Sequence, residues 1–257
     1  MTMVTATELC ELLERALERK ATDAVIAFDG DGTLWSGDVG EDVFHYATQH
    51  QLLTDAPLEA LHRSAEHFSL AVSGSASDVA TQIFQAYKAG KYPEQVMCEV
   101  MTWCYAGLGV DELERLIDAA LGGSAMLERA HGEVRHIIEW TRKRGVVAAI
   151  ISASPAPIVA RAAQHWGFAP SQIVAAIPEI REGRYAPRLA ALLPYGTTKA
   201  DLGRQHVGTR QWLASLGDNV FDWEMLHAAT LGIAVRPKDA LRRRLTPASK
   251  ILLLNPE

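Results

Sequence analysis

The sequence has few cysteines, no surplus of positive charge and no long apolar run, and each absence argues against a class of protein. Its three cysteines, Cys10, Cys98 and Cys104, form an odd set without the spacing of a metal site, so we expect reduced thiols rather than a disulfide framework. The formal net charge of −6 gives no electrostatic basis for a nucleic-acid partner. No apolar run is long enough to span a bilayer. The sequence therefore predicts a cytoplasmic protein with neither a nucleic-acid nor a membrane partner.

The composition is that of a folded globular chain. Of the 257 residues, 48% are hydrophobic and 22% are charged, which supplies enough apolar material for a sizeable core. The length suits one large domain or a core with an inserted module. Residues 6–20 carry apolar side chains at helical spacing, and Thr5 and Glu8 have the spacing of a capping box. We expect an amphipathic helix there.

Short apolar runs alternate with amphipathic helical patterns along much of the chain. Helical patterns at 132–145 and 156–168 separate some of these runs. Continuous short apolar runs are typical of strands covered on both faces, so the alternation predicts an α/β fold with a Rossmann-like parallel sheet and helices on both faces. The expected strands are residues 24–28, 146–151, 172–176, 212–216 and 231–235.

One region interrupts the alternation. Residues 37–126 carry apolar side chains at helical spacing in one segment after another, without a convincing strand. We therefore expect an α/β core formed by residues 1–36 and 127–257, with an all-helical module of residues 37–126 inserted after the first core strand. Gly183, in the middle of residues 179–187, indicates a small hairpin beside the sheet.

The first expected strand ends in a pair of acidic residues. Asp29 and Asp31 follow it directly with Gly30 between them, and residues two apart on an extended chain point the same way. Two carboxylates this close repel each other, so the site needs a cation or a raised pKa, and Mg²⁺ suits carboxylates combined with a phosphate. Gly30 and Gly32 let the backbone approach an anion, and Thr33 adds a hydroxyl. The alternative is a polar turn after a strand.

Three further stretches place polar side chains at strand ends or helix starts, the edge of an α/β sheet where ligands bind. Ser152 and Ser154 are either anion ligands or ordinary helix N-caps. Lys199 begins a helical stretch, where a surface lysine is the simple alternative. Asp218 and Asp222 share one face if a helix starts there, so both could belong to the ligand site. The alternative interpretation is that they are two acids that stabilise the helix N-terminus.

The order acid pair, hydroxyl, lysine, acid pair resembles the four motifs of the haloacid dehalogenase superfamily of aspartate-nucleophile phosphatases. "DGDGT" (29–33) is similar to motif one, Ser152 to motif two, Lys199 to motif three and "GDNVFD" (217–222) to motif four. The helical insert is similar to the type-one cap of that superfamily. "ISASP" and the small hairpin before Lys199 are most similar to its phosphoserine phosphatase branch.

The resemblance implies roles for the motif residues. Asp29 would attack phosphorus to form an aspartyl-phosphate, and Asp31 would serve as general acid and then general base. The cofactor would be Mg²⁺, held by the Asp29 carboxylate, the backbone carbonyl of Asp31 and Asp218, with Asp222 and Asn219 in the layer around these ligands. The implied phosphate-binding residues are Gly30, Gly32, Thr33, Ser152, Ala153 and Lys199.

Departures from that branch concern the substrate. A glycine stands there in the position of Ser154, so the polarity of the pocket differs at this point. In that branch a glutamate shortly after motif one meets the substrate amine, and Asp38 has this spacing with Glu41 close behind; the alternative is a solvated helix start. Arg63 is either a partner for a substrate carboxylate or a solvated helix arginine. Trp35 either lines the pocket mouth or packs at a hinge.

The sequence as a whole predicts an Mg²⁺-dependent hydrolase of a small phosphomonoester, either phosphoserine-like or otherwise amine-bearing. A phosphotransferase with the same aspartyl-phosphate would have the same motifs. A catalytically silent regulator that binds metal or phosphate is a further alternative, although none of the motif residues is lost. A true dehalogenase is disfavoured by Asp31 and Asp218, because a halide leaves without a proton.

Overall fold

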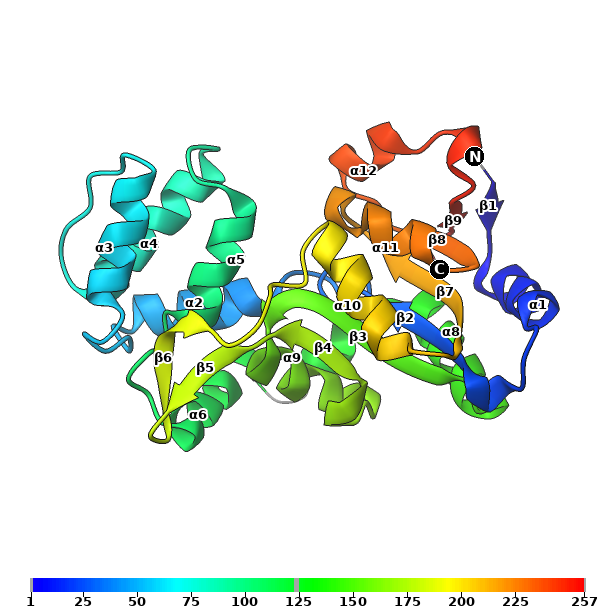
Figure 1. The fold of residues 1–257 in the computed structure, drawn as a ribbon, viewed down its shortest axis with the longest axis horizontal. Helices are drawn as coiled ribbons and strands as arrows, with labels where there is room; N and C mark the ends of the chain where they lie inside the picture. Colours follow the sequence, from blue (N-terminus) through cyan, green and yellow to red (C-terminus); the bar gives the residue numbers. More distant parts are fainter. Residues whose placement is uncertain (1, 123–124, 257) are drawn as a thin grey trace.

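A parallel sheet of seven strands forms the centre of the protein (Figure 1). The computed structural model describes residues 2–122 and 125–256. Every pairing within this sheet is parallel, which confirms the predicted fold class. In spatial order the strands are β1 (Met3–Val4), β9 (Leu252–Leu254), β8 (Leu231–Val235), β7 (Gln211–Gly217), β2 (Ala24–Phe28), β3 (Val147–Pro155) and β4 (Ile173–Ala176).

Each strand expected from the sequence is present, and two short strands at one edge were not anticipated. β1 and β9 pair in parallel, with Met3 beside Leu253 and Val4 beside Leu254. Segments of two and three residues are too short to show a periodic pattern, so tertiary pairing alone defines them. They bring segments from opposite ends of the sequence to the same edge of the sheet (Figure 1).

Helices cover both faces of the sheet, which explains why its central strands are apolar on both sides. In β2, Ile26 and Phe28 belong to one apolar cluster, and Val25 and Ala27 belong to another on the opposite face. The first cluster includes side chains of α1 (Ala6–Ala16), α8 (Gly132–Arg144) and α9 (Ala156–Ala163); the second includes those of α10 (Thr197–Val207) and α11 (Trp223–Ala228). α12 (Asp239–Arg244) packs beside α11 through Leu241.

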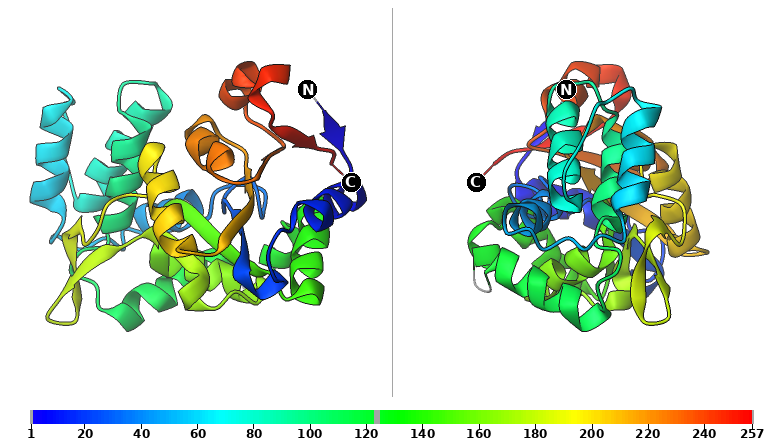
Figure 2. Two further views of the ribbon diagram at one scale, coloured as in Figure 1. Left: turned by 45° about the vertical axis from the view of Figure 1, so that its right-hand side comes forward. Right: turned by 90° about the vertical axis from the view of Figure 1, so that its left-hand side faces the viewer.

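The chain between β2 and β3 is a succession of helices, and no strand occurs among its described residues. α2 packs against α9 and α6, and α5 packs against β3. α3 and α4 lie at the end of the molecule opposite β1 (Figures 1 and 2). Two residues of the expected insert, 123–124, lie outside the described residues. The helices that precede α8 in this stretch are α2 (Val39–Gln49), α3 (Leu58–His67), α4 (Ala76–Lys88), α5 (Glu94–Trp103), α6 (Val110–Leu121) and α7 (Ala125–Glu128).

The small hairpin is present as expected and connects the sheet region to the inserted helices. β5 (Pro178–Arg181) and β6 (Arg184–Leu189) pair antiparallel. Glu182 and Gly183 form the turn with φ values of 50° and 76°, the left-handed conformation that two-residue hairpin turns require. The Gly107 amide donates to the Tyr185 carbonyl at 2.8 Å. β6 also packs against α5, so the hairpin supports the helical insert from below in Figure 1.

Among the described residues, no helix has both the length and the apolar character that a membrane span requires.

Short 3₁₀ helices occur at Ala21–Asp23, Gln164–Trp166, Pro170–Gln172, Val220–Asp222 and Pro247–Ser249.

The first helix begins at the predicted capping box and belongs to the main core. The Thr5 hydroxyl accepts from the Glu8 amide at 3.2 Å, and the Glu8 carboxylate accepts from the Thr5 amide at 2.8 Å. Leu9 and Leu13 are completely buried and join the apolar cluster that contains Ile26.

We expect Leu13→Ala to lower the free energy of unfolding by about 2–5 kcal/mol, because the lost side chain leaves a cavity between α1 and the sheet. Urea unfolding followed by circular dichroism measures this loss. Glu11→Ala, on the exposed face of the same helix, is the matched control and should change stability little. A loss below about 1 kcal/mol for Leu13→Ala would mean that α1 adds little to the core.

Candidate active site

Parallel pairing brings three of the four polar stretches to one edge of the sheet. Phe28, the last residue of β2, lies beside Ile150 of β3 and Leu216 of β7. Asp29 therefore emerges next to the carboxyl ends of both neighbouring strands, where Ser152 and Asp218 lie. This edge is where α/β sheets bind ligands.

Lys199 joins the acidic stretches from the first turn of α10. Its Nζ lies 2.5 Å from Asp29 Oδ1 and 2.6 Å from Asp222 Oδ1, and its side chain is completely buried. Burial lowers the pKa of Lys199, but the charges of Asp222 and Asp29 outweigh that effect and raise it. The side chain is therefore a buried cation that bridges two carboxylates, and the surface-lysine alternative is wrong.

Asp29 is buried beside more negative than positive charge. Burial raises its pKa well above the usual range, Lys199 opposes this effect, and the charges of Asp222 and Asp218 add to it. The Thr33 hydroxyl donates to Asp29 Oδ2 at 3.3 Å. The sequence predicts repulsion between Asp29 and Asp31, whereas in the structure the charges that raise the pKa of Asp29 are those of Asp222 and Asp218.

Asp218 approaches the loop after β2 so closely that only glycine fits opposite it. A Cβ atom on Gly32 would lie 2.1 Å from Asp218 Oδ2, and Gly32 also has a φ of +81°. The same oxygen lies 3.1 Å from Lys238 Nζ. The other oxygen, Oδ1, is buried without a hydrogen-bond partner among the described residues. Burial raises the pKa of Asp218 to about 7, against the opposing charge of Lys238.

Asp29, Asp218 and Asp222 form a buried acidic cluster in which each contributes a carboxylate oxygen within 4.8 Å of the others. Both carboxylate oxygens of Asp222 already accept hydrogen bonds within the protein. Its Oδ1 accepts from Lys199, and its Oδ2 accepts from the amides of Asp218 and Asn219 at 3.1 and 2.9 Å. It therefore orients Lys199 and the loop after β7. Asn219 caps the following 3₁₀ helix, where its Oδ1 accepts from the Val220 amide at 2.7 Å.

The Asp31 carboxylate is held by three donors. Its Oδ1 accepts from Trp35 Nε1 at 2.8 Å and from the Val39 amide at 2.7 Å, and its Oδ2 lies 2.6 Å from the Ser154 hydroxyl. Trp35 is completely buried and does not line the pocket, so the prediction that it forms the pocket mouth is wrong. Ser154 does line the pocket, but its hydroxyl is directed to Asp31.

Ser152 lies beside the acid pair at the end of β3. A Cβ atom on Gly30 would be 3.5 Å from the Ser152 hydroxyl oxygen, which itself accepts from the Ser154 amide at 3.1 Å. The N-cap position of α9 is Pro155, and no side chain caps that helix. The alternative in which these serines are ordinary N-caps is therefore wrong.

A cavity of about 380 Å³ opens between the sheet edge and the inserted helices. On the insert side, Asp38 caps α2 by accepting from the Glu41 amide at 2.8 Å, so the expected helix cap also faces the pocket. Burial raises its pKa well above the usual range, and the charge of Asp31 adds to this. The core contributes Asp29, Asp31, Gly32, Ser152, Ala153, Ser154, Asn219, Phe221 and Lys238, and the insert contributes Gly37, Asp38, Glu41, Tyr87, Lys88, Glu94, Met97, Cys98 and Met101.

Three charged residues of this pocket were not identified from the sequence: Lys88, Glu94 and Lys238. Lys88 is the last residue of α4. Lys238 lies three residues beyond β8, at the same carboxyl edge as the motif residues, so its position after a strand was a usable signal. Glu94 begins α5, and nothing in the local sequence distinguishes it from other acids at helix starts.

Arg63 does not belong to the pocket. It lies on α3 with its side chain exposed and paired with Glu59 one turn earlier. The expectation that it meets a substrate carboxylate is therefore wrong in this structure, because α3 packs at the far end of the insert (Figure 1).

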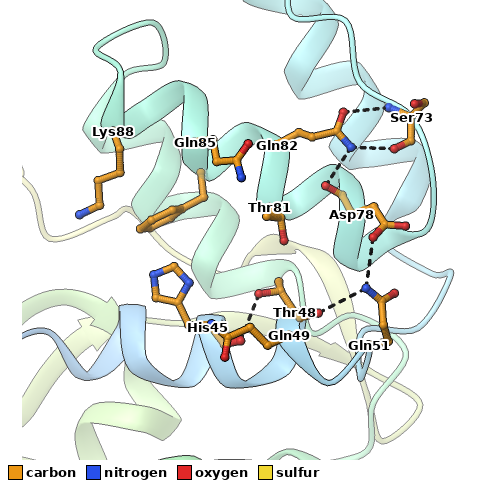
Figure 3. A pocket seen from close by; sticks show the side chains of 11 residues that line it. His45, Thr48, Gln49, Gln51, Ser73, Asp78, Thr81, Gln82, Gln85 and Lys88 are labelled. Carbon is orange, nitrogen blue, oxygen red and sulfur yellow. Dashed lines mark hydrogen bonds between the residues drawn. The ribbon is translucent and has the colours of Figure 1, made fainter.

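A larger groove of about 810 Å³ lies between α2 and α4 and contains none of the motif residues (Figure 3). At one end of the groove, lining residues hydrogen-bond to each other: Gln51 Nε2 donates to Asp78 at 3.1 Å, and Gln82 Nε2 donates to the Ser73 carbonyl at 2.7 Å. Lys88 lines both this groove and the smaller pocket. We assign the chemistry to the smaller pocket, because the buried charges converge there.

Comparison with models of protein families gives a match that covers most of the chain. Residues 26–227 match the sequence model of haloacid dehalogenase-like hydrolases, and the four polar stretches all lie within this span. No curated protein matches the sequence.

Several solved structures share the fold. A protein of unknown function from Bordetella pertussis Tohama I is 21% identical with a TM-score of 0.68, over 90% of this chain and 98% of that one. A HAD family hydrolase from Salmonella enterica subsp. enterica serovar Typhi is 17% identical with a TM-score of 0.59, over 96% and 75%. A substrate-bound phosphoserine phosphatase is 15% identical with a TM-score of 0.55, over 89% and 91%. At these identities the similarity establishes a common fold.

We expect Lys199→Met to lower the free energy of unfolding by about 3–5 kcal/mol, because Asp29 and Asp222 would be left buried without their shared cation. Urea unfolding in the absence of divalent metal measures the loss. The exposed Lys250→Met is the control for removal of a lysine charge. The double variant Lys199→Met/Asp222→Asn should recover part of the stability. An unchanged unfolding midpoint for Lys199→Met would contradict the role of this bridge.

Proposed function

Because the chain belongs to the haloacid dehalogenase-like hydrolase family, we propose that it is an Mg²⁺-dependent phosphomonoester hydrolase for a small, amine-bearing metabolite. The observation that carries the proposal is the convergence of Lys199 and Asp218 on Asp29, which itself lines the pocket. A carboxylate beside a buried cation and a second carboxylate fits nucleophilic attack on a phosphoryl group. The pocket volume of about 380 Å³ suits a small molecule.

Asp29 would act as the nucleophile. One of its carboxylate oxygens forms a bond to phosphorus while the bond between phosphorus and the ester oxygen breaks, and the leaving oxygen takes a proton from Asp31. A water molecule then attacks the phosphorus of the aspartyl-phosphate and gives its proton to Asp31. This step releases inorganic phosphate and regenerates the Asp29 carboxylate.

The surroundings of Asp31 suit a residue that gains and loses a proton. Its Oδ2 contacts the Ser154 hydroxyl at 2.6 Å, and a hydroxyl can donate to a carboxylate or accept from a carboxylic acid. The same contact therefore accommodates both protonation states. Trp35 and the Val39 amide hold the other oxygen, so the carboxyl group keeps its orientation while Oδ2 exchanges the proton.

The remaining motif residues would bind the transferring phosphoryl group. Ser152 supplies a hydroxyl beside Gly30, and Lys199 supplies an ammonium group that contacts Asp29. Backbone amides near Gly30 and at Ala153 would complete the set of donors, because the amides of Gly32 and Thr33 already donate to the carbonyls of Trp35 and Gly30. Because Lys199 is already held by Asp222, it would need little reorganisation when the phosphate binds.

The acidic cluster fits an Mg²⁺ ion. Asp218 Oδ1 is a buried carboxylate oxygen without a hydrogen-bond partner among the described residues, and carboxylate oxygens are the ligands that Mg²⁺ prefers. Asp29, Asp218 and the backbone carbonyl of Asp31 would hold the ion, with Asn219 and Asp222 around them. When bound, Mg²⁺ supplies positive charge that offsets the repulsion between nucleophile and phosphate.

Mg²⁺ should stabilise the protein against heat. At about 100 times its Kd, a ligand adds about 2.7 kcal/mol of stability, which corresponds to a rise in Tm of about 5–10 °C for a chain of this size. Asp218→Asn should lose most of this rise, because it removes a charged ligand. Asp201→Asn, on the exposed face of α10, is the control. Thermal unfolding with and without Mg²⁺ gives both values, and an undiminished rise for Asp218→Asn would refute the metal assignment.

Asp29→Asn should lower phosphate release from p-nitrophenyl phosphate by at least about 10³-fold, because the amide cannot form the aspartyl-phosphate. Its circular dichroism spectrum should match that of the wild-type protein. Asp23→Asn, at the exposed start of the first core strand, is the control. If Asp29→Asn kept its activity, the nucleophile would lie elsewhere; if the wild-type protein released no phosphate with Mg²⁺ present, the hydrolase proposal would fail.

A further inference from the structure

Both lysines that line the active-site pocket already have carboxylate partners. Lys88 Nζ lies 2.7 Å from Glu41, and Lys238 Nζ lies 3.1 Å from Asp218. No arginine lines the pocket within the described part of the chain. A carboxylate on the substrate would therefore meet a predominantly acidic wall without a free cation to neutralise it, which costs binding free energy.

Glu94 is the acid of this wall that is available to a ligand. It lies half-buried at the start of α5 and forms no ion pair with a described residue, whereas Glu41 is paired with Lys88 and one oxygen of Asp38 caps α2. Burial raises the pKa of Glu94, and the charge of Lys238 and the Tyr195 hydroxyl oppose this. The carboxylate of Glu94 therefore has no ion-pair partner to displace when a cation binds.

Aromatic and apolar side chains surround this carboxylate. Tyr87 and Phe221 line the same pocket, and Tyr195 stacks on Phe221 with the ring centroids 4.6 Å apart. Met97 adds apolar surface nearby. Lys88 Nζ already lies 5.0 Å from the centroid of the Tyr87 ring, and Lys199 Nζ lies 5.5 Å from that of Phe221. The Glu94 carboxylate would therefore supply the charge for a ligand cation, and the aromatic and apolar surface would accommodate the carbon atoms attached to the nitrogen.

We propose that Glu94 is a specificity-determining residue that binds a positively charged alkylammonium group on the alcohol part of the substrate, and that the preferred substrate carries no carboxylate. This inference rests on the proposed phosphatase activity and names its substrate class. The cation would lie against the insert wall while the phosphate lies at Asp29, so one small molecule would span the pocket from the core to α5.

A kinetic comparison of matched substrates tests the charge. Phosphocholine and phosphoethanolamine carry the ammonium group, 3,3-dimethylbutyl phosphate is the neutral isostere of phosphocholine, and phosphoserine adds a carboxylate. With Mg²⁺ we expect kcat/KM for a cationic substrate to exceed that for the neutral isostere by at least about tenfold, mainly through KM, because a charge paired inside a pocket discriminates strongly. Phosphoserine should be poorer than phosphoethanolamine.

Glu94→Gln should reduce the ratio of kcat/KM between phosphocholine and its neutral isostere by about tenfold, because the variant keeps the shape and removes the charge. Glu99→Gln is the matched control, since Glu99 is also a partly buried acid of α5 but does not line the pocket. p-Nitrophenyl phosphate reports phosphatase activity independently of the ammonium group.

The outcomes separate the two proposals. Hydrolysis of p-nitrophenyl phosphate with equal rates for cationic and neutral substrates would overturn the role of Glu94 and leave the phosphatase intact. No hydrolysis of any phosphomonoester by folded protein would overturn the phosphatase proposal itself. A preference for phosphoserine over phosphoethanolamine, or a ratio in Glu94→Gln equal to that of the wild type, would also overturn this inference. A difference between the two cationic substrates shows whether the bound ammonium is methylated.

Discussion

The Lys199 ammonium group, buried between Asp29 and Asp222, is the interaction on which the arrangement of the site depends. Three carboxylates gather at one sheet edge, and without a cation their burial would cost several kcal/mol. Lys199 neutralises part of this charge, while the amides of Asp218 and Asn219 bind the free oxygen of Asp222. One side chain from α10 thus connects the loop after β2 to the loop after β7.

The charge that Lys199 leaves uncompensated explains much of the remaining chemistry. Asp218 retains a buried oxygen that has no hydrogen-bond partner among the described residues, and its pKa is raised to about 7. Both features favour a further positive charge at this point. Lys238, in the loop after β8, supplies part of this positive charge, because its Nζ lies 3.1 Å from Asp218 Oδ2. The glycine at position 32 belongs to the same constraint, because any side chain there would occupy the space of the Asp218 carboxylate.

The inserted helices are connected to the acid pair through the backbone as well as through the pocket walls. Val39, the first residue of α2, donates its amide to Asp31, and Trp35 donates to the same oxygen. The orientation of Asp31 therefore depends on how α2 is placed against the sheet. The core carries Asp29 and the buried Lys199 cation, whereas the insert adds Glu41, Tyr87 and Glu94 to the pocket. Under the proposed function, reaction chemistry and substrate selection would be divided between these two parts of the chain.

The sequence by itself determined the parallel α/β class, the helical character of the insert, the hairpin and the motif residues, because apolar periodicity and strand-end positions are local properties. Only the tertiary structure decided between the alternatives for each residue. Lys199 is buried between two carboxylates, and Ser154 and Trp35 both donate hydrogen bonds to Asp31. Arg63 lies on an exposed face of α3. The short edge strands and the place of Glu94 in the pocket also depend on packing between distant segments, which no local pattern encodes.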